Sequence, residues 1–379
     1  MASPKKILIV AGEPSGDLHA SNLVKDLKSL DPSLRFFGLG GNLSREAGVD
    51  VVYDISKLAL IGLVEVIKNL SAVKAARSAV IGRIGRERPD LAILVDYPGF
   101  NLRLARYLKK RGIPVVYYIS PQVWAWGAGR IKIIKECVRK VVVFFKFEEE
   151  LYRRHGIEAE WVGHPLMETV KATLPRSETL KRYGLSQDKM TVALLPGSRT
   201  LEVTALLTPM LSAAALIKNR VKNVQFVIAK FKDLPAALYK NIMKGSGVDI
   251  ALAEGDTYNI VAAADFAIVA SGTATLETAL LGKPFLLVYK VNFLTYVASQ
   301  IVLRTPFLGL ANIIAGREIV PELLQFDVTP EKIAERAVSI LADDKRRAGI
   351  VSSLRSVAAS LGTPGASERA ARAIFPLLR

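Results

Sequence analysis

Short apolar runs alternate with amphipathic helical stretches along the whole chain. The runs are rich in β-branched residues and show little polar alternation, which is typical of parallel strands covered by helices on both faces. The pattern therefore predicts an α/β fold with parallel sheets. The expected strands are 6–10, 35–38, 91–95, 115–119, 140–144 and 159–162 in the first half, and 191–195, 224–228, 250–252, 266–269 and 285–288 in the second.

A strand–glycine–helix opening occurs once in each half, at Gly12 and at Gly197. A chain of 379 residues also exceeds the roughly 250–300 residues at which a single core stops growing. We therefore predict two Rossmann-like domains that face a central cleft, with ligands at the carboxyl ends of the strands. The expected divisions are 1–167, 168–345, and a group of C-terminal helices over 346–379 that packs back toward the first domain.

The composition adds an excess of positive charge. Lys and Arg total 52 against 35 Asp and Glu, a formal +17, although the mean hydropathy is +0.27. A chain that is both basic and rather apolar is suited to bind anionic small molecules, an anionic membrane surface or nucleic acid. The single cysteine, Cys137, excludes an internal disulfide and favours a reducing compartment. The apolar run near the N-terminus is too short for a signal peptide, and no run of about 18 apolar residues predicts a transmembrane helix.

Acidic residues follow two of the predicted strands in the first half. The turn 11–17 carries Glu13 and Asp17, whose charges favour hydroxyl recognition or base chemistry over phosphate binding; alternatively, Asp17 caps the following helix. Asp96 ends the strand 91–95 and precedes Pro98. A partly buried carboxylate there suits a general base, and the alternative is a turn-forming aspartate.

The segment 120–126, Ser-Pro-Gln-Val-Trp-Ala-Trp, also follows a predicted strand. Aromatic side chains most often pack in the core. The position of Gln122 and Trp124 in a loop suggests instead a cleft wall or a surface on which a sugar stacks. By contrast, the glycines at 38–41 do not form the dinucleotide-binding pattern, and we interpret them as a turn.

Two loops of the second half suit a nucleotide diphosphate. Arg199 follows Pro196-Gly197-Ser198, where its guanidinium can pair bidentately with a diphosphate and the N–H groups of the loop add to it. The segment 271–277 has small residues that let a diphosphate approach a helix N-terminus, and Glu277 about one turn further in could accept both ribose hydroxyls. Helix capping explains part of this segment without any ligand.

Metal and P-loop chemistry have no support in the sequence. Three histidines and one cysteine form no ligand cluster, and neither a GxxxxGK[ST] nor a GxSxG motif occurs. We therefore expect no cofactor and no metal. His19 reads as a helix-face residue, whereas His164, beside Gly163 and Pro165, is either structural or directed at the cleft.

Taken in order, these motifs closely resemble those of the lipid-A-disaccharide synthases, bacterial inverting glycosyltransferases of the GT-B type. The resemblance implies transfer of 2,3-diacylglucosamine from UDP to the 6-hydroxyl of 2,3-diacylglucosamine 1-phosphate, without a metal. The product is a β(1→6) disaccharide 1-phosphate. The motifs lie at 11–17, 96–101, 120–126, 163–166, 195–199, 271–277 and 312–318.

The resemblance also implies roles for individual residues. Asp96 is the leading base, Arg199 holds the diphosphate and Glu277 holds the ribose. Glu13 is expected to share the catalytic site. The remaining expected substrate-binding residues are Ser15, Asp17, Asn101, Gln122, Trp124, Ser198, Ser271, Gly272, Thr273, Ala274, Asn312 and Arg317.

Acylated substrates imply a membrane contact, and the segment 58–70 is apolar around most of a helix, with basic residues following it. Such a segment predicts either a core helix or an interfacial helix, and lipid substrates favour the second. We expect a cytoplasmic protein bound peripherally to the cytoplasmic face of the inner membrane, with its excess charge around residues 68–111. A homodimer is left open. The expected membrane residues are Leu60, Leu63, Val66, Ile67 and Leu70.

Two other kinds of protein would explain part of this sequence. Another GT-B enzyme, such as a peptidoglycan N-acetylglucosaminyltransferase or a UDP-sugar epimerase, would share the nucleotide motif at 272–277 but should lack those around Asp96 and Trp124. A nucleic-acid-binding protein would explain the sequence pI of about 9.8. The absence of a recognisable nucleic-acid module and the motifs at strand ends speak against it, so no nucleic-acid partner is expected.

Overall fold

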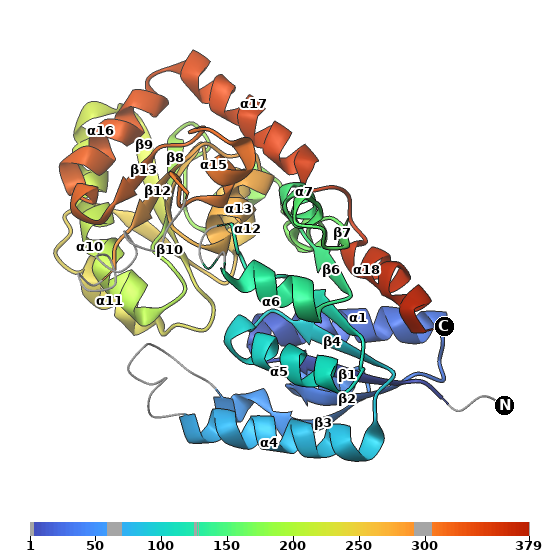
Figure 1. Cartoon of the computed structure of the whole chain (residues 1–379). Coiled ribbons are helices and arrows are strands. Elements are labelled where there is room, and N and C mark those ends of the chain that lie inside the picture. Colours follow the sequence, from blue (N-terminus) through green and yellow to red (C-terminus); the bar gives the residue numbers. More distant parts are fainter. Residues whose placement is uncertain (1–3, 59–69, 125–126, 128, 292–304, 379) are drawn as a thin grey trace. The chain divides into compact units, whose positions relative to one another are not determined.

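The structure, a computed structural model, describes residues 4–58, 70–124, 127, 129–291 and 305–378. The chain forms two compact units, one of Met1–Pro165 with Leu361–Arg379 and one of Leu166–Ser360. Each unit is built on a parallel sheet with helices on its faces (Figure 1). The predicted α/β class with two Rossmann-like sheets is confirmed.

The sheet of unit 1 has seven strands in the order β3-β2-β1-β4-β5-β6-β7, and all its pairs are parallel. The central strands β1 and β4 carry the continuous apolar runs seen in the sequence and are buried on both faces. The strands are β1 (Lys6–Ala11), β2 (Arg35–Gly40), β3 (Val49–Asp54), β4 (Leu91–Val95), β5 (Val115–Tyr118), β6 (Lys140–Val143) and β7 (Ala159–Trp161).

Helices bury one apolar cluster on each face of this sheet. The last helix, α18, joins the cluster that contains Leu23 of α1, and Arg369 of α18 donates from Nε to the carbonyl of Val162 at 2.8 Å. The chain therefore returns to unit 1 at its C-terminal end. The helices are α1 (Pro14–Leu30), α2 (Asn42–Glu46), α4 (Leu70–Glu87), α5 (Pro98–Lys110), α6 (Gly129–Cys137), α7 (Lys146–Arg154) and α18 (Ala366–Ile374), with 3₁₀ turns at Ile55–Leu58 and Phe375–Leu378.

The sheet of unit 2 has six parallel strands in the order β10-β9-β8-β11-β12-β13. The helix α17 packs in this unit against α13, α15 and α16. The strands are β8 (Met190–Leu195), β9 (Val224–Lys230), β10 (Ile250–Glu254), β11 (Phe266–Ala270), β12 (Phe285–Tyr289) and β13 (Glu322–Leu324). The helices are α8 (Leu166–Thr169), α9 (Arg176–Arg182), α10 (Thr200–Arg220), α11 (Ala236–Met243), α12 (Thr257–Ala263), α13 (Thr273–Leu280), α15 (Leu310–Ala315), α16 (Pro330–Leu341) and α17 (Asp344–Ser360), with a 3₁₀ turn at Gln325–Asp327.

One helix in the described part of the chain, α10, is long and apolar enough to cross a membrane by length and composition. Its apolar residues at every third or fourth position are buried in unit 2, as in a core helix. The expected membrane residues Leu60, Leu63, Val66 and Ile67 lie outside the described residues, and the side chain of Leu70 is likewise not described.

The interpretation of residues 38–41 as a turn is wrong for its first three residues. Gly38 to Gly40 continue β2, and the turn begins only at Gly41. Gly38 lies so close to β1 that an added Cβ would stand 1.8 Å from the carbonyl oxygen of Ile9. This glycine therefore serves close strand packing.

Candidate functional site

The carboxyl ends of β1 and β4 bring Glu13 and Asp96 together in unit 1. The two strands are neighbours, with Ala11 in register with Val95, so the turns that follow them meet at one edge of the sheet. Glu13 is exposed at the start of α1, and Asp96 is partly buried. Burial, and secondly the negative charge of Glu13, raise the pKa of the Asp96 carboxyl to about 6. A carboxylate with this pKa can accept a proton near neutral pH.

The backbone around Asp96 is held in a left-handed conformation that residues other than glycine rarely adopt. Asp96 and Tyr97 both have φ of 46°, and Ile119, at the end of the neighbouring strand β5, has φ of 61°. Each such residue costs about 1–3 kcal/mol and persists only where its surroundings impose the conformation, and such residues cluster at functional sites. These positions lie where the sequence predicted the base.

The ring of Tyr97 covers the first glycine of the turn 11–17. An added Cβ on Gly12 would stand 2.1 Å from Cδ1 of Tyr97, so only glycine lets the two segments approach. Tyr97 also stacks on Phe100, with 5.7 Å between ring centroids. The missing side chain at Gly12 therefore lets Tyr97, the residue that follows Asp96, pack against this turn.

Asp17 makes hydrogen bonds within the local fold of unit 1, and its assignment as a substrate-binding residue stays a prediction. Its buried carboxylate accepts hydrogen bonds from the backbone N–H groups of Gly41 (2.7 Å), Leu43 (3.1 Å) and Ser44 (3.2 Å), and from the hydroxyl of Ser44. The capping alternative is therefore nearer the structure, but the capped helix is α2, not α1. Ser15, two residues before Asp17, is exposed.

Two asparagines expected to bind substrate are fully buried. Asn101 donates from Nδ2 to the carbonyls of Val95 (3.1 Å) and Asp96 (2.8 Å). Asn312 accepts from the backbone of Val320 and donates to its carbonyl, which closes the loop after α15. Both side chains bind backbone groups next to the candidate sites, and their assignment as substrate-binding residues stays a prediction.

The loop after β5 is anchored by a residue that the sequence did not single out, Glu148. Trp124 donates from Nε1 to Oε1 of Glu148 at 3.0 Å, and its ring meets Phe147 edge to face at 5.4 Å. Burial raises the pKa of the Glu148 carboxyl to about 7. Three consecutive glutamates at 148–150 hide its special position in the sequence. Gln122 is exposed, and Trp126 lies outside the described residues.

Replacement of Glu148 with glutamine is expected to remove a pH dependence of stability. The folded pKa of about 7 lies above the ordinary glutamate pKa of about 4.5, so the folded state retains a proton that the unfolded state releases, and stability falls as pH rises between these values. Urea unfolding should therefore show Glu148→Gln gaining about 3 kcal/mol relative to the parent between about pH 4.5 and 8. The exposed neighbour Glu150→Gln serves as control; an equal gain there would contradict the burial of this charge.

The imidazole ring of His164 packs against two phenylalanine rings. It lies 5.3 Å from Phe144 and 5.1 Å from Phe145 between centroids. Burial, and secondly the charge of His19, lower its pKa to about 4. The imidazole is therefore neutral near pH 7, in keeping with the structural alternative.

In unit 2, the neighbouring strands β8 and β11 bring the loops 196–199 and 271–273 to one edge. The side chain of Arg199 is 79% exposed, and its guanidinium pairs with Glu202 at 3.3 Å. The other carboxylate oxygen of Glu202 accepts from the N–H groups of Ser198 (3.0 Å) and Arg199 (3.3 Å). The carboxylate of Glu202 thus occupies the N–H groups that we expected to bind a diphosphate. The guanidinium of Arg199 remains accessible.

The second loop leads into α13. Gly272 and Thr273 are exposed at its start, whereas Ser271 and Ala274 are partly exposed. Glu277 accepts a hydrogen bond from the hydroxyl of Tyr258 at 3.0 Å, and burial raises the pKa of its carboxyl. Arg317 is exposed after α15 and donates to the hydroxyl of Ser353 at 3.1 Å.

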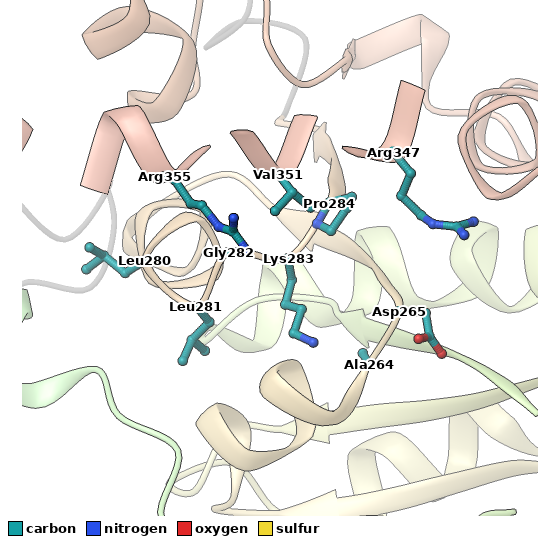
Figure 2. A pocket seen from close by; sticks show the side chains of 10 residues that line it. All are labelled: Ala264, Asp265, Leu280, Leu281, Gly282, Lys283, Pro284, Arg347, Val351 and Arg355. Atoms are coloured by element: carbon teal, nitrogen blue, oxygen red, sulfur yellow. The ribbon is translucent and has the colours of Figure 1, made fainter. Parts of the chain in front are cut away.

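A hollow of about 490 Å³ in unit 2 lies at the opposite end of the strands (Figure 2). Asp265 and Lys283, which line it, precede β11 and β12 and therefore mark the amino edge of the sheet. Two of its charged groups have partners: Asp265 pairs with Arg176 at 3.0 Å, and Arg347 donates to the carbonyl of Leu341 at 2.7 Å. This hollow is separate from the loops predicted to bind the nucleotide.

Among the described residues, no group of three or more His, Cys, Asp or Glu side chains is arranged to hold a metal ion. The polar groups at the strand ends are instead two carboxylates in unit 1 and an arginine with helix-start N–H groups in unit 2. The carboxylates of unit 1 suit proton abstraction, and the arginine and N–H groups of unit 2 suit the binding of an anionic nucleotide.

Solved structures with similar folds include a glycosyltransferase and a putative UDP-N-acetylglucosamine 2-epimerase. The calicheamicin glycosyltransferase has a TM-score of 0.62 at 15% identity, covering 100% of this chain and 99% of its own. A putative UDP-N-acetylglucosamine 2-epimerase from Listeria monocytogenes has a TM-score of 0.62 at 15% identity, covering 99% and 97%. The fold therefore places the chain in the GT-B class.

A family model described as lipid-A-disaccharide synthetase matches residues 7–373, and the lipid-A-disaccharide synthase of Syntrophus aciditrophicus is 46% identical over 99% of this chain and 98% of its own. The chain belongs to the lipid-A-disaccharide synthase family and is a glycosyltransferase. The synthase of Geobacter metallireducens is 41% identical over 100% and 98%. The resemblance of the sequence motifs is confirmed.

Proposed function

We propose that the chain transfers 2,3-diacylglucosamine from UDP to the 6-hydroxyl of 2,3-diacylglucosamine 1-phosphate. The products are a β(1→6)-linked disaccharide 1-phosphate and UDP. Family membership supports the reaction, and the observation that carries its mechanism is the partly buried Asp96, whose pKa is raised to about 6 beside Glu13. The carboxylate is positioned at the carboxyl end of a central strand, where this class of fold acts on its ligands.

The chemistry is one in-line displacement. The acceptor 6-oxygen attacks the anomeric carbon, its proton passes to Asp96, and the bond to the diphosphate breaks with its electron pair leaving on UDP. The transition state resembles an oxocarbenium ion, so the departing diphosphate needs cationic or N–H stabilisation. A single displacement inverts the α-linked donor to a β-linked product.

Unit 2 is proposed to hold the UDP part of the donor. Arg199 pairs with the diphosphate, the N–H groups at Gly272 and Thr273 add to it, and Glu277 accepts the ribose hydroxyls. Because Glu202 occupies the N–H groups of Ser198 and Arg199, the diphosphate either displaces this carboxylate or binds the guanidinium from its exposed side. The proposed nucleotide-binding residues also include Ser198, Ser271, Ala274 and Arg317. The residues of unit 1 proposed to contact the sugars are Glu13, Ser15, Gln122 and Trp124.

The rate should rise with pH through the pKa of Asp96, because only the ionised carboxylate accepts the proton. With a pKa of about 6, kcat/KM is expected to rise about tenfold per pH unit below that value and to level above it. The replacement Glu13→Gln removes a charge that raises this pKa, so the rise should move to lower pH. A rise centred near the ordinary carboxylate value of about 4, unmoved by Glu13→Gln, would contradict the assignment.

The acylated substrates place the reaction at a membrane surface, and we assign the contact to the apolar residues within 58–70 and the basic residues that follow. Replacing Leu63, Val66 and Ile67 together with serine should release the protein from vesicles that contain anionic phospholipid. Sedimentation with the vesicles measures this, and a preserved melting temperature serves as the control for folding. Unchanged sedimentation, or loss of the fold, would assign the segment to the core.

A further inference from the structure

The backbone carbonyl of Asp96 is held by two buried side chains. The hydroxyl of Tyr117 donates to it at 2.7 Å, and Nδ2 of Asn101 donates to it at 2.8 Å. The N–H of the same residue donates to the carbonyl of Tyr118 at 3.1 Å, so both backbone polar groups of Asp96 are bound. These bonds meet at the residue where the chain turns from β4 into the left-handed region.

Tyr117 reaches this carbonyl from the neighbouring strand β5, and Asn101 reaches it from the first turn of α5. Both side chains are fully buried. Burial, and secondly the negative charge of Asp96, raise the pKa of the Tyr117 phenol well above its ordinary value, so the hydroxyl remains a donor at every working pH. Asn101 also binds the carbonyl of Val95 at 3.1 Å and thereby spans the end of β4.

We propose that Tyr117 and Asn101 are positioning residues for Asp96. Two donors on one carbonyl fix the orientation of the peptide between Asp96 and Tyr97, and this orientation sets where the Asp96 side chain points. These two bonds add to the bond from the N–H of Asp96 to the carbonyl of Tyr118 in holding two successive residues at left-handed φ, and without them the turn relaxes. The inference rests on the proposed role of Asp96 as the base.

The test compares Tyr117→Phe with Tyr118→Phe. Both variants remove one buried hydroxyl from the same strand, but the two side chains lie in apolar clusters on opposite faces of the sheet. A misplacement of about 1 Å costs on the order of 10²-fold in rate, so Tyr117→Phe should lower kcat about 10- to 100-fold with KM for both substrates unchanged. The control should retain kcat at a comparable melting temperature.

The pH profile adds a readout that simple loss of stability would not move. If the turn relaxes, Asp96 gains solvent and its pKa falls, so the acidic limb of kcat in Tyr117→Phe should shift to lower pH. Equal losses of kcat in the two tyrosine variants, or a Tyr117→Phe effect on KM alone, would overturn the positioning role.

A double variant separates this inference from the proposed function. If Tyr117 acts through Asp96, the variant Asp96→Asn/Tyr117→Phe should be no slower than Asp96→Asn alone. Losses that multiply would refute the positioning role while leaving Asp96 as the base. Near-normal transfer by Asp96→Asn itself would instead refute the proposed mechanism, and the positioning inference with it.

Discussion

Asp96→Asn is expected to lower the rate of disaccharide formation by about 10²- to 10⁴-fold, the usual contribution of a general base. The amide has nearly the same shape as the carboxyl group, so it should preserve the turn, but it cannot take the proton of the acceptor hydroxyl. UDP affinity should stay unchanged, because the proposed nucleotide residues lie in unit 2 and Asp96 lies in unit 1. A transfer assay together with calorimetric titration of UDP measures both quantities.

Asp90→Asn provides the matched control, because Asp90 immediately precedes the same strand at its amino end and pairs with Lys5 at 3.1 Å. That variant should transfer at nearly the parent rate. If Asp96→Asn stays within about tenfold of the parent, which is roughly 1.4 kcal/mol of barrier, Asp96 is not the base.

The second large effect is expected for Gly12→Ala. The new Cβ would stand 2.1 Å from the ring of Tyr97, so the ring and the Asp96–Tyr97 turn must move. A displacement of about 1 Å at the base costs on the order of 10²-fold in kcat. Steady-state kinetics and the melting temperature should therefore show a loss of rate that exceeds what the loss of stability explains.

Gly16→Ala, in the first turn of α1, controls for this experiment. A Cβ on Gly16 would meet Cβ of Ala11 at 3.5 Å, an ordinary contact, so this variant should keep its rate. Similar losses of rate in both variants would show that the helix start, and not the contact with Tyr97, is sensitive.

The sequence was sufficient to predict the strands of the sheet interiors, because their apolar runs reflect burial on both faces. Two strands escaped prediction, β3 and β13, and each lies at an edge of its sheet. β3 includes Asp50 and ends at Asp54, and β13 has three residues, so neither forms a continuous apolar run. The other two edge strands, β7 and β10, were predicted, so an edge position weakens the sequence signal without removing it.

The location of the candidate site was also predictable, because motifs at strand ends meet at one edge of a parallel sheet. The partners of its side chains were not, because they are far apart in the chain. Asp17 binds residues 41–44, and Trp124 binds Glu148. The hydroxyl of Tyr117 reaches Asp96 only because β4 and β5 are neighbours. No local pattern shows that Asp17 and Asn101 support the backbone.

Product analysis of the purified protein tests the central claim most directly. The protein is incubated with UDP-2,3-diacylglucosamine and radiolabelled 2,3-diacylglucosamine 1-phosphate, and the product is identified by mass and by NMR of the new linkage. We predict one molecule of UDP released for each β(1→6) disaccharide 1-phosphate formed. An α-linked product, an epimerised UDP-sugar, or release of UDP without a disaccharide would contradict inverting transfer to the 6-hydroxyl.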